Sequence, residues 1–355
     1  MQNETEEHMK DLKKITIREG IIERAFDYQE EEDAELISIY KYFEEKFQEL
    51  YQSYADIFHL DNCVFYIRED YYRCNAFAGK IYEYNIIGIT NAYPVLMKDK
   101  FNDQFSNIIC IGFINEKSIS DAYCDLHEDQ GFKFNEFMLN CSIQYTFSHE
   151  FQHILQFKSS KIPKNFLYSE NLDKSDFSLE KHVWEFDADR MASYEVLKYA
   201  FSVYRSLKDK NNEKLKCMLY LALASIVITK SLFYFGVTNP INSECTIYKQ
   251  DFYTKQYSHP HPLVRIYNMV EYFYDNIKDD FPKLDIDFQQ ILNNVLGISK
   301  LYFDNLIPNP NVMQDYFEDT RKFLDEINHY NQELYDFAIK DKSISSLLKK
   351  RGINF

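Results

Sequence analysis

The chain has 355 residues, of which 45% are hydrophobic and 27% are charged, and its formal net charge is −16. This length and composition are those of a packed globular protein with one large domain or two ordinary ones, and they exclude a disordered chain. The acidic balance argues against non-specific nucleic-acid binding, because phosphate contacts need clustered Lys and Arg side chains.

The seven cysteines are scattered along the chain, and no two of them have the C-x-x-C spacing. Such a set predicts a reducing compartment without a disulfide framework or a cysteine zinc site. Residues 1–7 carry neither a basic segment nor an apolar one, so we expect no signal peptide. The sequence therefore predicts a cytoplasmic protein.

Residues 1–60 predict a helical region, because residues 21–58 carry apolar side chains at helical spacing without Gly or Pro. The expected buried stripe comprises Ile37, Ile39, Tyr40, Phe43, Phe47, Leu50 and Tyr51. The acidic run at residues 30–35 is interpreted as a solvated helix face, with a docking site for a basic partner as the alternative.

A small sheet is predicted within residues 61–115. Three short segments there are rich in β-branched and aromatic residues, at residues 62–67, 80–89 and 107–114. The edge strand of such a sheet can pair with an extended peptide. The polar residues 115–135 and 159–176 are expected to be loops.

Residues 135–157 predict a helix buried on one side that carries the pattern H-E-x-x-H at His149, Glu150 and His153. Residues four apart share one helix face, so both imidazoles can point at one metal ion. Glu150 sits beside that face, where it can reach a metal-bound water. The pattern predicts a metallohydrolase, which still needs a third ligand.

A second helical segment, residues 179–207, supplies Glu185 as the natural third ligand. Two histidines and a glutamate are a standard set for catalytic zinc, so we expect one zinc ion per chain. Asp189, one turn later on the same face, is expected to accept an N–H from a ligating imidazole. Asp187 is expected to be exposed. His182 can also approach the metal, although a surface or core histidine is the favoured interpretation.

Residues 217–229 are apolar, and the apolar pattern resumes after Lys230 up to residue 237. The uninterrupted part is shorter than the ~20 residues that a spanning helix needs, and Lys230 inside a bilayer would be unfavourable. We expect a buried core helix, with a membrane segment as the alternative. Further helices are predicted at residues 263–277, 288–301 and 312–338.

The motifs together resemble the gluzincin metallopeptidases. H-E-x-x-H, followed by E-x-x-A-D-R from Glu185 to Arg190, is most similar to the HtpX and CAAX-prenyl-protease type. That type also carries a later His-Pro followed by Arg, which His259-Pro260 and Arg265 match. The resemblance covers residues 138–275. It implies catalytic roles for His259 and Arg265, in gating the site or stabilising the oxyanion, and a loop histidine is the alternative for His259.

The segments predict an α+β fold that is predominantly helical, and the resemblance implies a zincin-like metallopeptidase core with a small sheet before the H-E-x-x-H helix. The expected organisation is an N-terminal helical region, a metallopeptidase domain with its metal-site helices at residues 135–207, and a C-terminal helical extension, over residues 1–60, 61–280 and 281–355.

HtpX-type enzymes carry clear membrane spans, whereas this chain has at best one candidate, at residues 217–237, and this departure suggests a soluble relative. The layout also resembles the Lit-type phage-exclusion peptidases, which cleave a cytoplasmic host protein. The predicted function is a zinc-dependent endopeptidase for a protein or peptide substrate, with Glu150 as the general base. The alternatives are a non-proteolytic protein with a structural or vestigial metal site, a helical interaction protein, and a membrane-associated protease.

Overall fold

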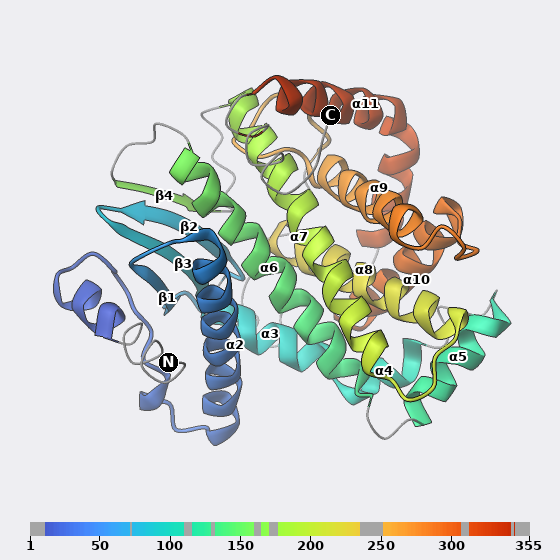
Figure 1. The fold of residues 1–355 in the computed structure, drawn as a ribbon, viewed down its shortest axis with the longest axis horizontal. Helices are drawn as coiled ribbons and strands as arrows, with labels where there is room; N and C mark the ends of the chain where they lie inside the picture. The colour runs from blue at the N-terminus through green and yellow to red at the C-terminus, as the bar shows by residue number, and fades with distance from the viewer. Residues whose placement is uncertain are drawn as a thin grey trace.

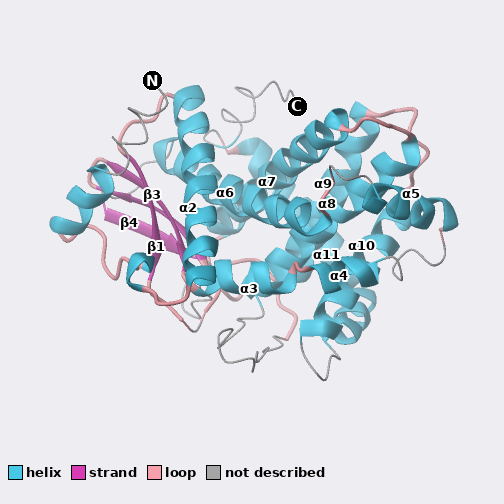
Figure 2. Ribbon diagram, turned by 90° about the horizontal axis from the view of Figure 1, so that it is seen from below, coloured by secondary structure: helices cyan, strands magenta, loops and turns pink. Residues whose placement is uncertain are grey.

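The computed structural model describes residues 11–71, 73–109, 116–128, 132–159, 165–169, 177–234, 251–306, 312–341 and 344. A small mixed sheet lies at one side of the molecule, and helices make up the rest (Figure 1 and Figure 2). The predicted α+β, predominantly helical fold class is confirmed.

The sheet has the strand order β1-β3-β2-β4, with β1 at Cys63–Arg68, β2 at Ala76–Ile81, β3 at Tyr84–Thr90 and β4 at Asn165–Ser169. β1 is parallel to β3, whereas β2 is antiparallel to both β3 and β4. Alternate residues face opposite sides, as strand geometry requires. Phe65 packs into the main core, whereas Val64 and Ile86 join a smaller cluster closed by Leu12 and Ile22.

The helices surround one large core. Residues 11–18 are helical, and the other helices are η1 (Tyr28–Glu30), α2 (Ala34–Phe58), α3 (Ala92–Lys100), α4 (Asp103–Ile109), α5 (Lys117–Glu128), α6 (Phe134–Ser159), α7 (Leu179–Ser206), α8 (Asn212–Tyr234), α9 (Pro262–Asp280), α10 (Phe288–Leu306) and α11 (Val312–Lys340). α2 packs on β1, and α6 packs on β2 and β3. The most extensive contact between elements of the described chain joins α6 and α7, which lie side by side at the centre of Figure 1.

Most of the long helices were predicted within a few residues of their observed ends. The predictions at residues 135–157, 179–207, 263–277, 288–301 and 312–338 correspond to α6, α7, α9, α10 and α11. α11 is tied to the metal-site helices, because the Tyr330 hydroxyl hydrogen-bonds His182 of α7 and the Asn331 amide donates to the backbone of α9.

The predicted helix over residues 21–58 is wrong in its first part. Helix α2 begins only at Ala34, because the Asp33 side chain accepts hydrogen bonds from the backbone N–H groups of Glu35 and Leu36. The acidic run at residues 30–35 therefore spans the start of a helix rather than one of its faces. Within α2 the expected stripe is buried at Ile39, Tyr40, Phe43, Phe47 and Tyr51.

Two of the predicted strands are also wrong. Residues 80–89 are not one strand, because β2 and β3 form a hairpin whose tight turn places Tyr82 at φ 53°. Residues 107–109 of the predicted strand 107–114 close helix α4, and residues 110–114 lie outside the described residues. Short apolar runs fit a buried helix as well as a strand, which explains the second error.

Two segments expected to be loops contain regular structure. Helix α5 occupies much of residues 115–135 and buries Ile119, Ala122, Tyr123 and Leu126 at helical spacing. Strand β4 lies within the predicted loop 159–176 and pairs in register with β2, Tyr168 opposite Ala78. The sheet predicted for residues 61–115 therefore takes its fourth strand from beyond the H-E-x-x-H helix.

Helix α8 is the predicted apolar helix. By length and composition its segment Asn212–Leu232 could cross a membrane, but 94% of its most apolar part is buried inside the protein. Lys230 is itself only 2% exposed. This burial is that of a core helix, as the sequence predicts. Residues 235–237 of the predicted apolar stretch lie outside the described residues.

Candidate metal centre

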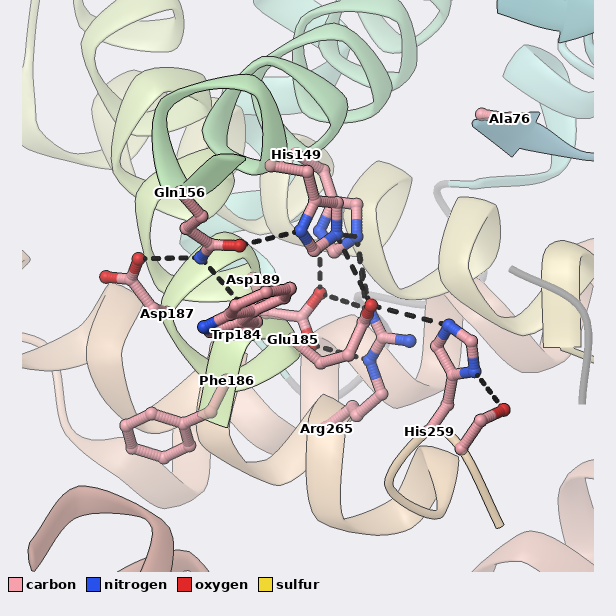
Figure 3. A network of polar contacts seen from close by, with 12 residues as sticks. Ala76, His149, Gln156, Trp184, Glu185, Phe186, Asp187, Asp189, His259 and Arg265 are labelled. Carbon is pink, nitrogen blue, oxygen red and sulfur yellow. Dashed lines mark hydrogen bonds and ion pairs between the residues drawn. The ribbon is translucent and has the colours of Figure 1, made fainter. Parts of the chain in front are cut away.

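Helices α6 and α7 bring the three predicted metal ligands together. His149 and His153 share one face of α6, and Glu185 of α7 faces both of them. Figure 3 shows His149 and Glu185 with Asp189, Arg265 and His259 around them. One ligand atom from each residue lies within 4.8 Å of the other two. This group can therefore hold a metal ion.

The ligand atoms face one small space. His149 Nε2 lies 3.2 Å from His153 Nε2. The Oε2 atom of Glu185 lies 3.4 Å from His149 Nε2, and Oε1 lies 3.3 Å from His153 Nε2. The exposed fractions of His149, His153 and Glu185 are 2%, 1% and 0%, so the group is enclosed by protein.

Glu185 is a carboxylate held ionised inside the core. Neither of its oxygens accepts a hydrogen bond of ordinary geometry from the described chain, although Arg265 Nη2 lies 2.5 Å from Oε2. Burial raises the pKa of a carboxyl, but the charge of Arg265 is the largest of the opposing effects, which together hold the pKa of Glu185 well below its usual range. The deprotonated form is the one that binds a metal.

Asp189 lies one turn after Glu185 and has three polar neighbours, Arg265, Tyr145 and His149. Arg265 binds it through Nε at 2.6 Å and Nη2 at 2.8 Å, and the Tyr145 hydroxyl donates to it at 2.8 Å. His149 Nδ1 lies 3.1 Å from its Oδ1, the pairing that the helical spacing predicts. Burial raises the pKa of Asp189, but Arg265 more than offsets this effect, so that the pKa lies below its usual range.

His153 has a partner that the sequence analysis missed. Its Nδ1 lies 2.8 Å from Gln156 Oε1, and the Gln156 amide nitrogen donates to Asp187 at 2.9 Å. Gln152 also donates to Asp187, at 2.5 Å. The prediction that Asp187 is exposed is wrong, because these two amides of α6 cover it and leave 3% exposed. The position of Gln156, three residues after His153 on a helix, is the signal that could have revealed this contact.

His259, just before α9, and Arg265, in the first turn of α9, both reach the centre. His259 Nε2 lies 3.4 Å from Glu185 Oε1, and its Nδ1 lies 2.9 Å from the Ser258 hydroxyl. Arg265 Nη2 lies 3.4 Å from His149 Nε2, beside its contacts with the two carboxylates. The structure thus places both residues at the ligands, and their catalytic roles stay predictions.

Strand β4 places Tyr168 over the candidate centre. The Tyr168 ring centroid lies 4.8 Å from that of His153 and 5.2 Å from that of His259. Leu167, the preceding residue, points away and is 44% exposed, as strand alternation requires. Among the strands of the described residues, β4 is the outermost on this side of the sheet, so this edge borders the site.

Two further residues from the sequence analysis lie outside the ligand group. Glu150 is 2% exposed and follows His149 on α6. His182 is a core histidine, because its Nε2 donates to the Tyr257 carbonyl at 2.7 Å and its Nδ1 accepts from the Tyr330 hydroxyl at 2.8 Å. Burial lowers the pKa of His182 to about 4, against a partial opposing effect of the Tyr257 hydrogen bond.

Comparisons with models of protein families, with curated proteins and with solved structures find no match to this chain. The function is therefore inferred from the residues of the centre themselves.

Proposed function

We propose that the protein is a zinc-dependent endopeptidase. The observation that carries this proposal is the buried group of His149, His153 and Glu185, whose ligand atoms converge within 4.8 Å. Glu150 follows His149 directly in the sequence and occupies the general-base position of H-E-x-x-H. The later His-Pro and Arg, which resemble those of HtpX-type gluzincins, lie against the same group, since both His259 and Arg265 contact Glu185.

The ligand set favours zinc, because catalytic zinc binds imidazole nitrogens and carboxylate oxygens. The two imidazole Nε2 atoms lie 3.2 Å apart, and each faces a different oxygen of Glu185, His153 at 3.3 Å from Oε1 and His149 at 3.4 Å from Oε2. Three protein ligands also leave a tetrahedral position open, as hydrolysis requires.

The residues around the ligands have distinct roles in the proposed hydrolysis. When bound, zinc lowers the pKa of a water ligand and polarises the scissile carbonyl. Glu150 takes the proton from the attacking water and delivers it to the leaving amine. Arg265 holds Glu185 and Asp189 in place through its contacts with both, and His259 is the candidate donor to the developing oxyanion.

The proposed substrate is a cytoplasmic protein or peptide, as the likeness to Lit-type peptidases implies. Strand β4 supports a peptide substrate, because an extended chain can add to a sheet edge beside the ligands. The net charge of −16 opposes nucleic acid as a partner.

The burial of the centre favours a second candidate, a non-proteolytic or latent metal site. All three ligands and Glu150 are 2% exposed or less, and His259 stands 3.4 Å from Glu185 Oε1. A structural zinc site is closed by a fourth protein ligand, and His259 is the residue placed to become one.

The test compares the full-length wild type with Glu150→Gln. Metal analysis of both purified proteins is expected to give one zinc ion per chain, and His149→Ala is expected to lose it. A proteome-wide search for new N-termini is expected to find cleavage by the wild type and none by Glu150→Gln, because the general base is lost.

Glu136→Gln is the matched control, since Glu136 is an exposed glutamate on the same helix and should leave cleavage unchanged. Identical sets of N-termini from zinc-loaded wild type and Glu150→Gln would contradict the peptidase and favour the closed metal site.

A further inference from the structure

We propose that Gln156 and Asp187 position the second histidine ligand. Asp187 holds the Gln156 amide, and this amide orients the His153 imidazole so that its Nε2 lone pair is directed at the metal. The inference rests on the proposed metal centre and adds two positioning residues to it. Gln156 lies beyond H-E-x-x-H, and Asp187 occupies an unspecified position of E-x-x-A-D-R, so neither belongs to the motifs.

The contacts of the Gln156 amide allow one orientation. Its Nε2 lies 3.0 Å from the Trp184 carbonyl oxygen and 2.9 Å from Asp187 Oδ2. Both of these atoms accept hydrogen bonds, so the nitrogen of the amide must face them. A flipped amide would place its oxygen against two acceptors inside the core. Gln156 Oε1 therefore faces His153. Figure 3 shows the Gln156 amide between the imidazoles and Asp187.

This orientation determines the tautomer of His153. An amide oxygen only accepts, so His153 Nδ1, at 2.8 Å from it, carries the hydrogen. In the neutral imidazole, Nε2 then holds a lone pair, and Nε2 is the atom 3.2 Å from His149 Nε2 and 3.3 Å from Glu185 Oε1. The Gln156 amide thus selects the tautomer that metal binding needs.

Asp187 is itself held by its surroundings. Gln152 donates to the same Oδ2 atom at 2.5 Å, and Asp187 is 3% exposed. Rotation of the carboxylate away from Gln156 would leave buried polar atoms unsatisfied, which is unfavourable. Helix α7 thus orients both imidazoles: Asp189 lies 3.1 Å from His149 Nδ1, whereas Asp187 acts on His153 through Gln156.

The test replaces Gln156 with methionine, which keeps the length of the side chain and removes both hydrogen-bonding groups. The zinc affinity of the full-length protein, measured by competition with a chromophoric chelator, is expected to fall about 10- to 100-fold. Histidine NMR of the metal-free chain is expected to show His153 as the Nδ1–H tautomer in the wild type. In Gln156→Met both tautomers are expected.

Gln144→Met is the matched control. Gln144 is a buried amide on the same helix, but it hydrogen-bonds Ser148 and Tyr54 rather than a ligand, so its loss should change neither tautomer nor affinity. Asp187→Asn keeps an acceptor oxygen for both amides and is expected to stay close to the wild type. Asp187→Ala is expected to behave like Gln156→Met.

Two outcomes would overturn the proposal. One is a Gln156→Met protein with the wild-type tautomer and zinc affinity, and the other is equal losses in Gln156→Met and Gln144→Met, which would indicate general damage to α6. A wild type that binds no zinc but holds His153 as the Nδ1–H tautomer contradicts the proposed function alone and supports the role of Gln156.

Discussion

Arg265 is the cation that compensates the two carboxylates of α7 at the centre. It is 3% exposed and lies 2.5 Å from Glu185 and 2.6 Å from Asp189. Because a buried charge that loses its partner is strongly destabilising, Arg265→Met is expected to lower the free energy of unfolding by about 3–5 kcal/mol. Urea denaturation of the chelator-treated protein measures this loss.

Zinc should restore part of that stability, since the ion supplies positive charge next to the same carboxylates. Arg18→Met, at an exposed position, is the control and should change little. A full loss of stability in Arg265→Met that zinc leaves untouched would argue against a metal between these groups.

His182 makes stability depend on pH. Its pKa is lowered by burial from 6.5 to about 4 in the folded protein, so between these values the unfolded chain binds a proton that the folded chain does not. The free energy of unfolding therefore falls as the pH drops from 6.5 towards 4, by up to about 3 kcal/mol from this residue.

His182→Gln does not titrate and can still donate to the Tyr257 carbonyl. Urea denaturation at pH 7 and near pH 4, with a chelator present, should show a smaller loss for this variant than for the wild type. Equal losses would remove His182 as a source of the pH dependence.

Among the helices, α8 is apolar enough to be either a core helix or a membrane helix, and its buried side chains distinguish the two. Ile226 is fully buried there, so Ile226→Ala should lower the free energy of unfolding by about 2–5 kcal/mol. Ile57→Ala on α2, where the side chain is 66% exposed, is the same change at the surface and should cost about 0.5 kcal/mol or less. Equal effects, or recovery of the protein in the membrane fraction, would contradict a core helix.

The metal ligands could be predicted because helical geometry is local. Four-residue spacing places His149 and His153 on one face of α6, and the same spacing places Glu185 and Asp189 on one face of α7. Helical spacing alone does not predict that α6 and α7 pack together. That pairing was predicted because His, His and Glu form a complete ligand set for catalytic zinc.

The missed features depend on partners far along the chain. β4 is a strand because Tyr168 and its neighbours pair with β2, and nothing within residues 159–176 indicates that pairing. Aspartate side chains are usually exposed, and Asp187 is buried because Gln152 and Gln156 of another helix donate hydrogen bonds to it. The start of α2 was missed for a different reason, since Asp33 is a local cap hidden in an acidic run.

For the molecule as a whole, metal binding should be coupled to folding, because the ligands come from two helices at the centre of the core. A metal that binds only the folded chain, present at ~100 times its dissociation constant, stabilises by about 2.7 kcal/mol. Thermal unfolding is thus expected at a higher temperature with zinc than with chelator. His149→Ala should abolish the difference, and a shift that survives this change would place the metal elsewhere.

Strand β4 belongs to the segment between α6 and α7, yet it completes a sheet whose other strands all precede α6. A fragment ending at residue 159 would keep both histidines but uncover the edge of β2, and uncovered edges invite pairing with other chains. A fragment beginning at β4 would keep Glu185 and lose both imidazoles. The sheet and the metal centre therefore cannot be exchanged as separate modules, and transplanting the centre into another protein means moving β1 through α9 together.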